Sequence, residues 1–306
     1  MYDLMIIGGG PAAIAAGVYA GRKKIKTILI TEALGGQSIV SDQIENWIGT
    51  PKISGWELAQ NLEKHLKEYK DEVLVVEGER VVSVARREKT FRATTERGAH
   101  FDARYLLVAS GSRRKKLGVP GEKEYDGKGV AYCSTCDAPL FRGKDVAVVG
   151  GGNAGAEAVI DLLPYANSVK LLVRSDAMKA DAVTRDAVLA SPKVEVITNA
   201  QVQAIRGGAF VESLEYLDKL NNQVITLPVA GVFVEIGAIP NSEFVKELVT
   251  LNERGEIVVD HRTFVAADGI WAAGDVCDSL YKQNNISAGE GVTALLNIYD
   301  RLVKGE

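Results

Sequence analysis

Short apolar runs that end at glycine or charged residues dominate the hydrophobic pattern of the chain. Leu4–Ile7, Thr27–Thr31 and Tyr105–Ser112 are runs of this kind. Continuous apolar stretches of this length are typical of strands buried in a parallel sheet. An alanine-rich segment from about Ala12 to Arg22 separates the first two runs and predicts a helix. The alternation of strand, helix and strand favours an α/β fold.

The same plan occurs a second time. A strand predicted at Asp145–Val149 leads into the loop GGGNAG, then into a helix at Ala156–Leu163 and a strand at Val169–Val173. The second loop begins at Gly150, and the first, GGGPAA, begins at Gly8. An internal repeat of this kind predicts two Rossmann-like units, each with three layers. The remaining predicted strands are Val73–Val76, Val81–Ala85, Thr90–Thr95 and Gly269–Asp275.

We expect the second unit to be inserted in the first. Residues 1–113 and 242–306 would form one discontinuous domain, and residues 114–241 would form the other. The basic run from Arg113 to Lys116 falls at this boundary. It is interpreted as a solvated domain edge, with docking of an acidic partner as the alternative.

The first glycine loop has the features of a dinucleotide site. Gly8 permits a tight turn, and Gly10 lets a pyrophosphate approach the backbone at the start of the helix. The small side chain of Ala13 allows the helix to pack on the sheet. Glu32, at the end of the next strand, is placed to bind ribose hydroxyls.

Composition excludes several classes of protein. With 46% hydrophobic and 25% charged residues, the chain is typical of a globular protein, and it has no apolar run long enough to cross a bilayer. Its net charge of −4 argues against nucleic-acid binding. The N-terminus leads directly into an apolar strand and shows no signal peptide, so we expect a cytoplasmic protein.

Two of the three cysteines form a CxxC motif at Cys133 and Cys136. Such a pair is more often redox-active than structural in a reducing compartment. A metal site is disfavoured because zinc needs about four ligands and the third cysteine, Cys277, is isolated. Cys277 is interpreted as a buried apolar residue, and the histidines as surface or structural residues. No metal is expected.

Several stretches together resemble the low-molecular-weight thioredoxin reductases and the flavoprotein subunit of bacterial alkyl hydroperoxide reductase. The matching stretches are GGGPAAIAAGVYA (8–20), GGQ (35–37), IENW (44–47), ASGS (109–112), YCSTCDAPLF (132–141), GGGNAGAEA (150–158), AAGD (272–275) and YKQNNISAGEGVTALL (281–296). The last stretch and MKAD (178–181) are more similar to the hydroperoxide reductase flavoprotein. That flavoprotein usually carries an N-terminal thioredoxin-fold region, so the chain is expected to be the reductase core, with a separate thioredoxin-like protein as its acceptor.

The resemblance implies a role for each matching position. FAD would be bound by Gly8, Gly10, Pro11, Ala12, Ala13, Glu32, Gly36, Gln37, Asn46, Gly111, Asp275, Gln283, Ile286 and Ser287. NADPH or NADH would be bound by Gly150, Gly152, Asn153, Ala154, Gly155, Arg174 and Lys179. The resemblance also implies a homodimer, and one domain that rotates against the other during turnover.

The dithiol would pass electrons from the flavin to the acceptor. By family analogy, Cys136 faces the flavin and Cys133 attacks the acceptor disulfide. Asp137, beside Cys136, is a candidate acid that protonates the leaving thiolate, and a capping contact at a helix start is a compatible alternative.

The segment that follows the second predicted strand of the second unit does not decide which electron donor the protein uses. NADPH-using thioredoxin reductases usually show the pattern HRRxxxR there, and this chain has VRSDAMK from Val173 to Lys179. Arg174 matches the first Arg of the pattern, and Ser175 replaces the second. Val173 stands at the position where an acidic residue would favour NADH. The alternatives are reduced ferredoxin as the donor, a peroxiredoxin system as the acceptor, or a redox-sensing flavoprotein without turnover.

Overall fold

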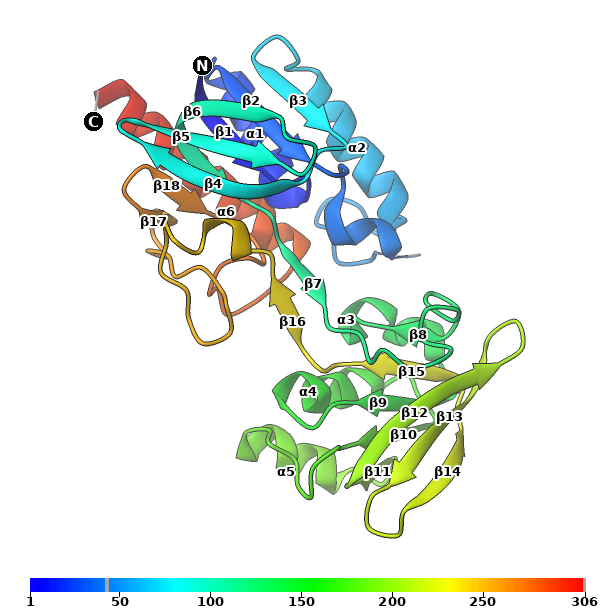
Figure 1. Ribbon diagram of the computed structural model, residues 1–306. Helices are drawn as coiled ribbons and strands as arrows, with labels where there is room; N and C mark the ends of the chain where they lie inside the picture. Colours follow the sequence, from blue (N-terminus) through cyan, green and yellow to red (C-terminus); the bar gives the residue numbers. More distant parts are fainter. Residues whose placement is uncertain (42–43, 305–306) are drawn as a thin grey trace. The chain divides into compact units, whose positions relative to one another are not determined.

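The structure is a computed structural model that describes residues 1–41 and 44–304. Its internal contacts divide it into two compact units (Figure 1). Unit 1 comprises Met1–Arg113 and Ile239–Glu306, and unit 2 comprises Arg114–Ala238. The chain passes from one unit to the other through β7 (Ser112–Arg114) and returns through β16 (Ala238–Pro240), and these two strands pair with each other.

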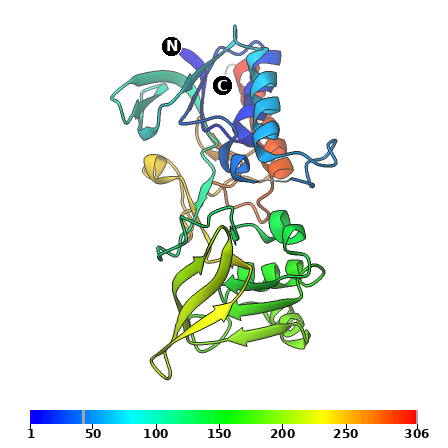
Figure 2. The same cartoon turned by 90° about the vertical axis from the view of Figure 1, so that its right-hand side faces the viewer.

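Unit 1 is built on a sheet with the strand order β17-β18-β6-β1-β2-β3, to which β5 and β4 are added beside β6. Strand β1 pairs in parallel with both β2 and β6. Helices α1 and α6 pack against each other beside the sheet (Figure 2). Its elements are β1 (Tyr2–Ile7), α1 (Pro11–Arg22), β2 (Thr27–Thr31), η1 (Gly36–Val40), α2 (Gly55–Lys67), β3 (Val73–Glu77), β4 (Val81–Arg87), β5 (Thr90–Thr95), β6 (His100–Val108), η3 (Glu243–Val245), β17 (Val265–Ala267), β18 (Ile270–Ala272) and α6 (Asn284–Lys304).

Unit 2 has three layers. Its parallel sheet has the order β11-β10-β9-β15-β8, and alternate residues of β9 face opposite sides. Val146 and Val148 belong to the core beneath α4, whereas Ala147 and Val149 belong to the core beneath the antiparallel sheet β12-β13-β14. Its elements are β8 (Val130–Ala131), α3 (Ser134–Asp137), η2 (Ala138–Phe141), β9 (Asp145–Val149), α4 (Asn153–Leu162), β10 (Ser168–Leu172), α5 (Ala182–Ala190), β11 (Val194–Ile197), β12 (Ala200–Gly207), β13 (Val211–Asp218), β14 (Gln223–Pro228) and β15 (Gly231–Val234).

Small residues set the distance between α1 and α6. Ala12, Ala13 and Ala16 are buried in the core of unit 1. A Cβ atom placed on Gly291 of α6 would lie 2.2 Å from the carbonyl oxygen of Ala12, so the two helices touch backbone to backbone. A glycine is required at this crossing because no other side chain fits.

The predicted α/β class and the parallel sheets are confirmed. Helix α4 begins at Asn153, earlier than expected, because Gly152 already takes the extended conformation of an N-cap. The apolar residues Ala294, Leu295 and Ile298 of α6 are fully buried in the core of unit 1, so they give no support for a dimer surface. The homodimer therefore stays a prediction.

Two glycines of α6 provide a matched test of the helix crossing. We expect Gly291→Ala to lower the free energy of unfolding by about 1–3 kcal/mol, because the added methyl group overlaps the backbone of α1. Gly289→Ala adds the same group where no described heavy atom lies within 4 Å. It should stabilise the helix by up to about 1 kcal/mol. Chemical denaturation of both variants measures the difference, and equal effects would contradict the assigned contact.

Candidate functional site

The first glycine loop is closed by backbone contacts at the end of β1. Gly8 has φ +130°, and a Cβ atom there would lie 2.1 Å from the carbonyl oxygen of Ala109. Gly36 has φ +60°, and its Cβ atom would lie 2.9 Å from the Cα atom of Gly10. These two positions bring η1 close to the start of α1. A larger residue at either of them would displace the loop.

The N-terminus of α1 is open to an anion. Gly10 is its N-cap and Pro11 its first residue, and within residues 1–41 and 44–304 no side chain hydrogen-bonds the cap. The first amide groups of a helix have no partner inside the helix, and the helix dipole favours negative charge there. The loop therefore fits a pyrophosphate, and binding by Gly8, Gly10 and Ala13 stays a prediction.

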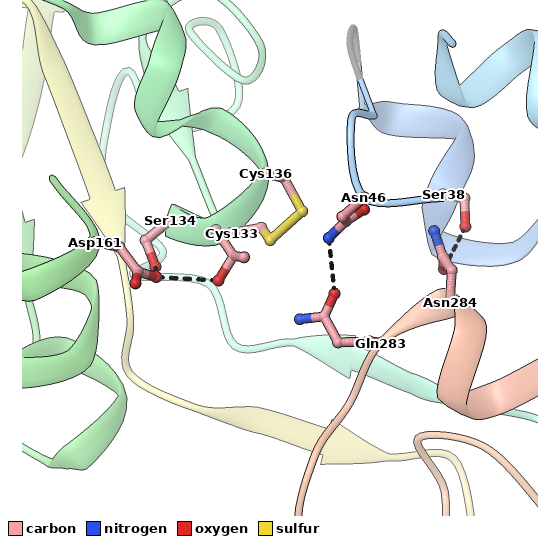
Figure 3. Close-up of a disulfide and its surroundings, with 9 residues drawn as sticks. Ser38, Asn46, Cys133, Ser134, Cys136, Asp161, Gln283 and Asn284 are labelled. Atoms are coloured by element: carbon pink, nitrogen blue, oxygen red, sulfur yellow. Dashed lines mark hydrogen bonds between the residues drawn. A yellow bond between two sulfur atoms is a disulfide. The ribbon is translucent and has the colours of Figure 1, made fainter. Parts of the chain in front are cut away.

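The structure brings four of the predicted flavin residues together in pairs within unit 1. The Asn46 side-chain amide donates to Oε1 of Gln283 at 3.1 Å (Figure 3). The Ser287 hydroxyl donates to Oδ1 of Asp275 at 3.3 Å. Gln283 lies just before α6, and Ser287 lies in the first turn of this helix. The start of α6 is thus tied both to the segment at Asn46 and to the turn after β18.

The other predicted flavin residues lie at element ends and loops of unit 1. Glu32 is exposed at the end of β2, Gln37 is exposed in η1, and Gly111 follows β6 with φ +65°. Ile286 is partly exposed in the first turn of α6. These positions form the same carboxyl-terminal edge region of β1, β2 and β6 that carries the glycine loop.

Sequence reasoning missed several polar residues at this edge. Glu290 is only 8% exposed, and its carboxylate accepts from the backbone N–H of Gly274 at 2.7 Å. Burial raises the pKa of this carboxyl group. Ser38 and Asn284 join η1 to α6 through a hydrogen bond of 2.9 Å (Figure 3). The signal available for Glu290 was an acid among small residues in the stretch SAGEGV, where a buried helix face is expected.

The second glycine loop, in unit 2, has the same construction. Gly152 is the N-cap of α4, and in the described part of the chain neither a side-chain cap nor a heavy atom within 4 Å of a hypothetical Cβ atom is found there. A Cβ atom on Gly155 would lie 1.9 Å from the carbonyl oxygen of Gly150, so the helix packs closely on the loop. Ala154 lies in the first turn of α4.

A segment after β10 lies against this loop. The backbone N–H of Lys179 donates to the carbonyl oxygen of Gly151 at 2.6 Å. The side-chain oxygen of Asn153 accepts from the backbone N–H of Asp181 at 2.9 Å. The side chains of Arg174 and Lys179 are both exposed. The segment is therefore held by its backbone while its basic side chains stay free to reach a ligand.

Strand register shows which residue of unit 2 corresponds to Glu32. Ile7 pairs with Ile30 in unit 1, and Val149 pairs with Leu172 in unit 2. Glu32 lies two residues after Ile30, and Arg174 lies two residues after Leu172, so Arg174 occupies in unit 2 the position of Glu32. Val173 is only 1% exposed and packs on Gly151. The position that faces outward at the strand end thus carries a positive charge in unit 2 and a negative charge in unit 1.

The CxxC motif forms a disulfide at the start of a short helix in unit 2. Cys133 and Cys136 are bonded, with a Cα–Cα distance of 5.3 Å, and both residues are half-buried. Cys133 is the N-cap of α3, and the backbone N–H of Asp137 donates to its carbonyl oxygen at 3.0 Å. The predicted trio of Cys133, Cys136 and Asp137 is thus held on one helical turn.

Sequence reasoning missed two carboxylates of unit 2, and one of them contacts the residues between the cysteines. Asp161 of α4 accepts hydrogen bonds from the hydroxyls of Ser134, at 2.8 Å, and Thr135, at 3.0 Å (Figure 3). Glu235, which follows β15, is 8% exposed, and burial raises its pKa to about 7. Neither residue belongs to a local motif, so the pattern of the sequence carried no signal for them.

Comparison with known proteins agrees with this arrangement. Residues 2–291 match the family described as pyridine nucleotide-disulphide oxidoreductase. The chain belongs to this family. Membership implies FAD and a pyridine nucleotide as cofactors, and the paired glycine loops of the two units fit such groups. Within the described residues, no cluster of metal-binding side chains and no helix suited to crossing a membrane is found.

Among curated relatives, the chain is 40% identical over 303 residues to a protein named NADH dehydrogenase from Bacillus subtilis. It is 41% identical over 305 residues to the F component of alkyl hydroperoxide reductase from Pseudomonas aeruginosa. Both comparisons cover 99% of this chain but only 59% and 58% of the relatives. The chain therefore spans less than two thirds of the length of these proteins.

Solved structures of thioredoxin reductases match over nearly their whole length. The enzyme from Streptococcus pyogenes gives a TM-score of 0.90 at 33% identity, with 99% of each chain covered. The enzyme from Giardia duodenalis gives a TM-score of 0.90 at 30% identity, again with 99% of each chain covered. The predicted membership of the thioredoxin reductase family is confirmed.

Proposed function

We propose that the protein passes electrons from a pyridine nucleotide through FAD and the Cys133–Cys136 pair to the disulfide of a thioredoxin-like protein. The observation that supports this most directly is the half-buried disulfide at the start of α3. A structural disulfide is normally buried and far from reactive groups, whereas this one is reachable and has Asp137 on the same helical turn.

Unit 1 is proposed to hold the FAD and unit 2 the pyridine nucleotide. When bound, FAD supplies two-electron transfer between a pyridine nucleotide and a disulfide. The open N-terminus of α1 would bind its pyrophosphate, and Glu32 would bind ribose hydroxyls. Asn46 and Gln283 would fix the position of the start of α6, where Ser287 orients Asp275.

The reduced cysteines would act in two exchange steps. The thiolate of Cys133 attacks one sulfur of the acceptor disulfide, forms a mixed disulfide and releases a thiolate of the acceptor. Cys136 then attacks the sulfur of Cys133, restores the intramolecular disulfide and releases the second acceptor sulfur. Asp137 would supply a proton to a leaving thiolate, which is a general-acid role.

A peroxide-reducing system is a second candidate for the acceptor. The relatives named as the F component of alkyl hydroperoxide reductase are more similar in sequence, at 39–41% identity, than the thioredoxin reductases compared by structure, at 30–33%. On this proposal the acceptor is a thioredoxin-fold domain that in turn reduces a peroxiredoxin. Both candidates require the same exchange chemistry at Cys133.

The nucleotide is proposed to be NADPH. Arg174 occupies the outward position at the strand end, where a 2′-phosphate would accept charge-assisted hydrogen bonds, and Lys179 adds a second charge nearby in sequence. The name of the Bacillus subtilis relative points to NADH for that protein. Arg174 is the reason to expect a different preference here, and reduced ferredoxin is the alternative donor.

Flavin binding can be tested with two glycines that both have positive φ. We expect heat to release non-covalently bound FAD from the wild type, and Gly36→Ala to lose most of this FAD because its methyl group would lie against Gly10. Gly98→Ala has the same backbone strain, with no described heavy atom within 4 Å, and should keep its FAD. Absorbance spectra of the purified proteins give the occupancy. Release of FMN, or equal loss in both variants, would contradict the assignment.

The dithiol step can be tested by trapping. Cys133→Ser and Cys136→Ser should each abolish reduction of a thioredoxin-like disulfide while leaving FAD bound. Cys136→Ser should also accumulate a mixed disulfide with the acceptor through Cys133, because the resolving thiol is missing, and non-reducing gels with mass spectrometry detect it. Asp137→Asn should lower kcat by about 10²-fold or more. Full activity in either cysteine variant would end the disulfide reductase proposal.

Nucleotide preference can be tested at Arg174. We expect Arg174→Ala to lower kcat/KM for NADPH by about 10- to 100-fold, since a hydrogen bond to a charged group contributes about 1.5–3 kcal/mol. The value for NADH should change far less. Arg185→Ala removes an exposed arginine of α5 and is the control. Equal losses for both nucleotides would contradict the role of Arg174, and wild-type indifference to both would favour ferredoxin.

A further inference from the structure

A carboxylate of α4 holds the two residues that separate the cysteines. Oδ2 of Asp161 accepts from the Ser134 hydroxyl at 2.8 Å and from the Thr135 hydroxyl at 3.0 Å (Figure 3). Ser134 is buried, whereas Thr135 is exposed. Hydrogen bonds to an ionised carboxylate are about twice as strong as bonds between neutral groups. One side chain from another helix thus fixes two consecutive residues of the CxxC turn.

The residue before Cys133 is fixed by a separate contact. The Tyr132 hydroxyl donates to Oε1 of Glu122 at 3.1 Å, and Glu122 is buried. The same carboxyl group accepts from two backbone N–H groups of the segment that precedes it. The chain is therefore anchored up to Cys133 without the help of Asp161, and the part on which Asp161 acts is the turn that follows.

This turn is too short to keep its own shape. Helix α3 has four residues, and the backbone N–H of Asp137 closes it by donating to the carbonyl oxygen of Cys133. Forming a first helical turn is unfavourable, because several backbone angles are fixed for one hydrogen bond. While the disulfide is intact, the sulfur–sulfur bond adds a further constraint. After reduction that constraint is lost, and the hydrogen bonds to Asp161 still hold the turn.

We propose that Asp161 is a positioning residue of the dithiol. It holds the turn in the geometry of the disulfide and thereby lowers the reduction potential of the Cys133–Cys136 pair. The importance of this effect for turnover rests on the disulfide reductase function proposed above, in which a lower potential makes the pair a stronger reductant of its acceptor. The same constraint keeps Cys136 close to the sulfur that it attacks in the second exchange step.

The direction of the effect follows from thermodynamic reciprocity. A dithiol reductant supplies two electrons and two protons, one proton for each cysteine sulfur. The sulfur–sulfur bond of the pair breaks, and the reductant closes to its own disulfide. The intact disulfide holds Ser134 and Thr135 where their hydroxyls meet Asp161, so it favours these hydrogen bonds. By linkage, the hydrogen bonds favour the disulfide by the same factor. Removing them therefore makes the pair easier to reduce.

The experiment removes each side of the interaction in turn. Asp161→Ala removes the acceptor, and the double variant Ser134→Ala/Thr135→Val removes both donors. A triple variant combines the three substitutions. Each full-length holoenzyme is equilibrated without oxygen in mixtures of reduced and oxidised dithiothreitol at one neutral pH. Alkylation and mass spectrometry of the peptide with Cys133 and Cys136 give the reduced fraction, from which the equilibrium constant for reduction is obtained.

We expect the equilibrium constant for reduction to rise more than about threefold in Asp161→Ala. The double variant should show a rise of similar size. The triple variant should show no more than either, because the acceptor and the donors belong to one interaction and their effects are not additive. The reduction potential of the pair is the quantity that a merely structural role of Asp161 would leave unchanged.

Asp145→Ala is the matched control. Asp145 also accepts from two side chains, those of Asn167 at 2.7 Å and Ser168 at 2.6 Å. It is the first residue of β9, whereas the CxxC turn follows the carboxyl end of β8, which runs in the same direction in this sheet. Asp145→Ala therefore loses similar hydrogen bonds at the opposite end of the sheet, and its equilibrium constant should match that of the wild type.

An unchanged equilibrium constant in Asp161→Ala would overturn the proposal. A triple variant whose change is the product of the two separate changes would overturn it as well, because the two sides would then act independently. An equal rise in Asp145→Ala would assign the effect to the stability of unit 2 and have the same consequence. If Asp161→Ala does not fold, the double variant decides alone, and an unchanged constant there contradicts the proposal.

The readout separates this inference from the proposed function. It is the redox state of two cysteines in equilibrium with dithiothreitol, so it depends neither on an acceptor protein nor on a nucleotide. A wild type that reduces no acceptor, together with the expected rise in the variants, would refute the proposed function and keep the role of Asp161.

Discussion

Both units depend on the same backbone contact. The glycine that follows β1 or β9 lies against the carbonyl group of the residue that follows the neighbouring strand, β6 or β15. The distances for a hypothetical Cβ atom are 2.1 Å at Gly8 and 2.2 Å at Gly150. The contact turns the chain sharply, so that α1 and α4 start directly above the end of the sheet. The contact thereby places the open N-termini of α1 and α4 at this end of each sheet.

Much of this could be predicted from local sequence. The two strand–loop–helix–strand repeats are visible because periodicity and glycine spacing are local properties. The resemblance implied that Asn46, Asp275, Gln283 and Ser287 bind the flavin. Their pairing as Asn46–Gln283 and Ser287–Asp275 was not expected, because the members are far apart in the chain or lack a spacing rule. The correspondence of Arg174 with Glu32 could be recognised only from the structure, because it depends on the register of the paired strands.

Three carboxylates could not be predicted in this way. Glu290, Asp161 and Glu235 lie in segments that read as ordinary helix or strand ends. Tertiary contacts bring the backbone amide of Gly274 to Glu290 and the hydroxyl of Ser134 to Asp161. Burying a carboxyl group costs free energy unless it is hydrogen-bonded, and the bond from the Gly274 amide offsets part of that cost for Glu290.

The paired strands β7 and β16 have a consequence for the order of synthesis and folding. Unit 2 is continuous in sequence, so all of its residues have been made once Ala238 is added. Unit 1 still lacks β18 and α6 at that moment, although these elements supply Trp271, Ala294 and Leu295 to its core. On the ribosome the first 113 residues must therefore wait, with an incomplete core, until the last segment emerges. Long-range closure of this kind makes unit 1 the slower of the two to fold.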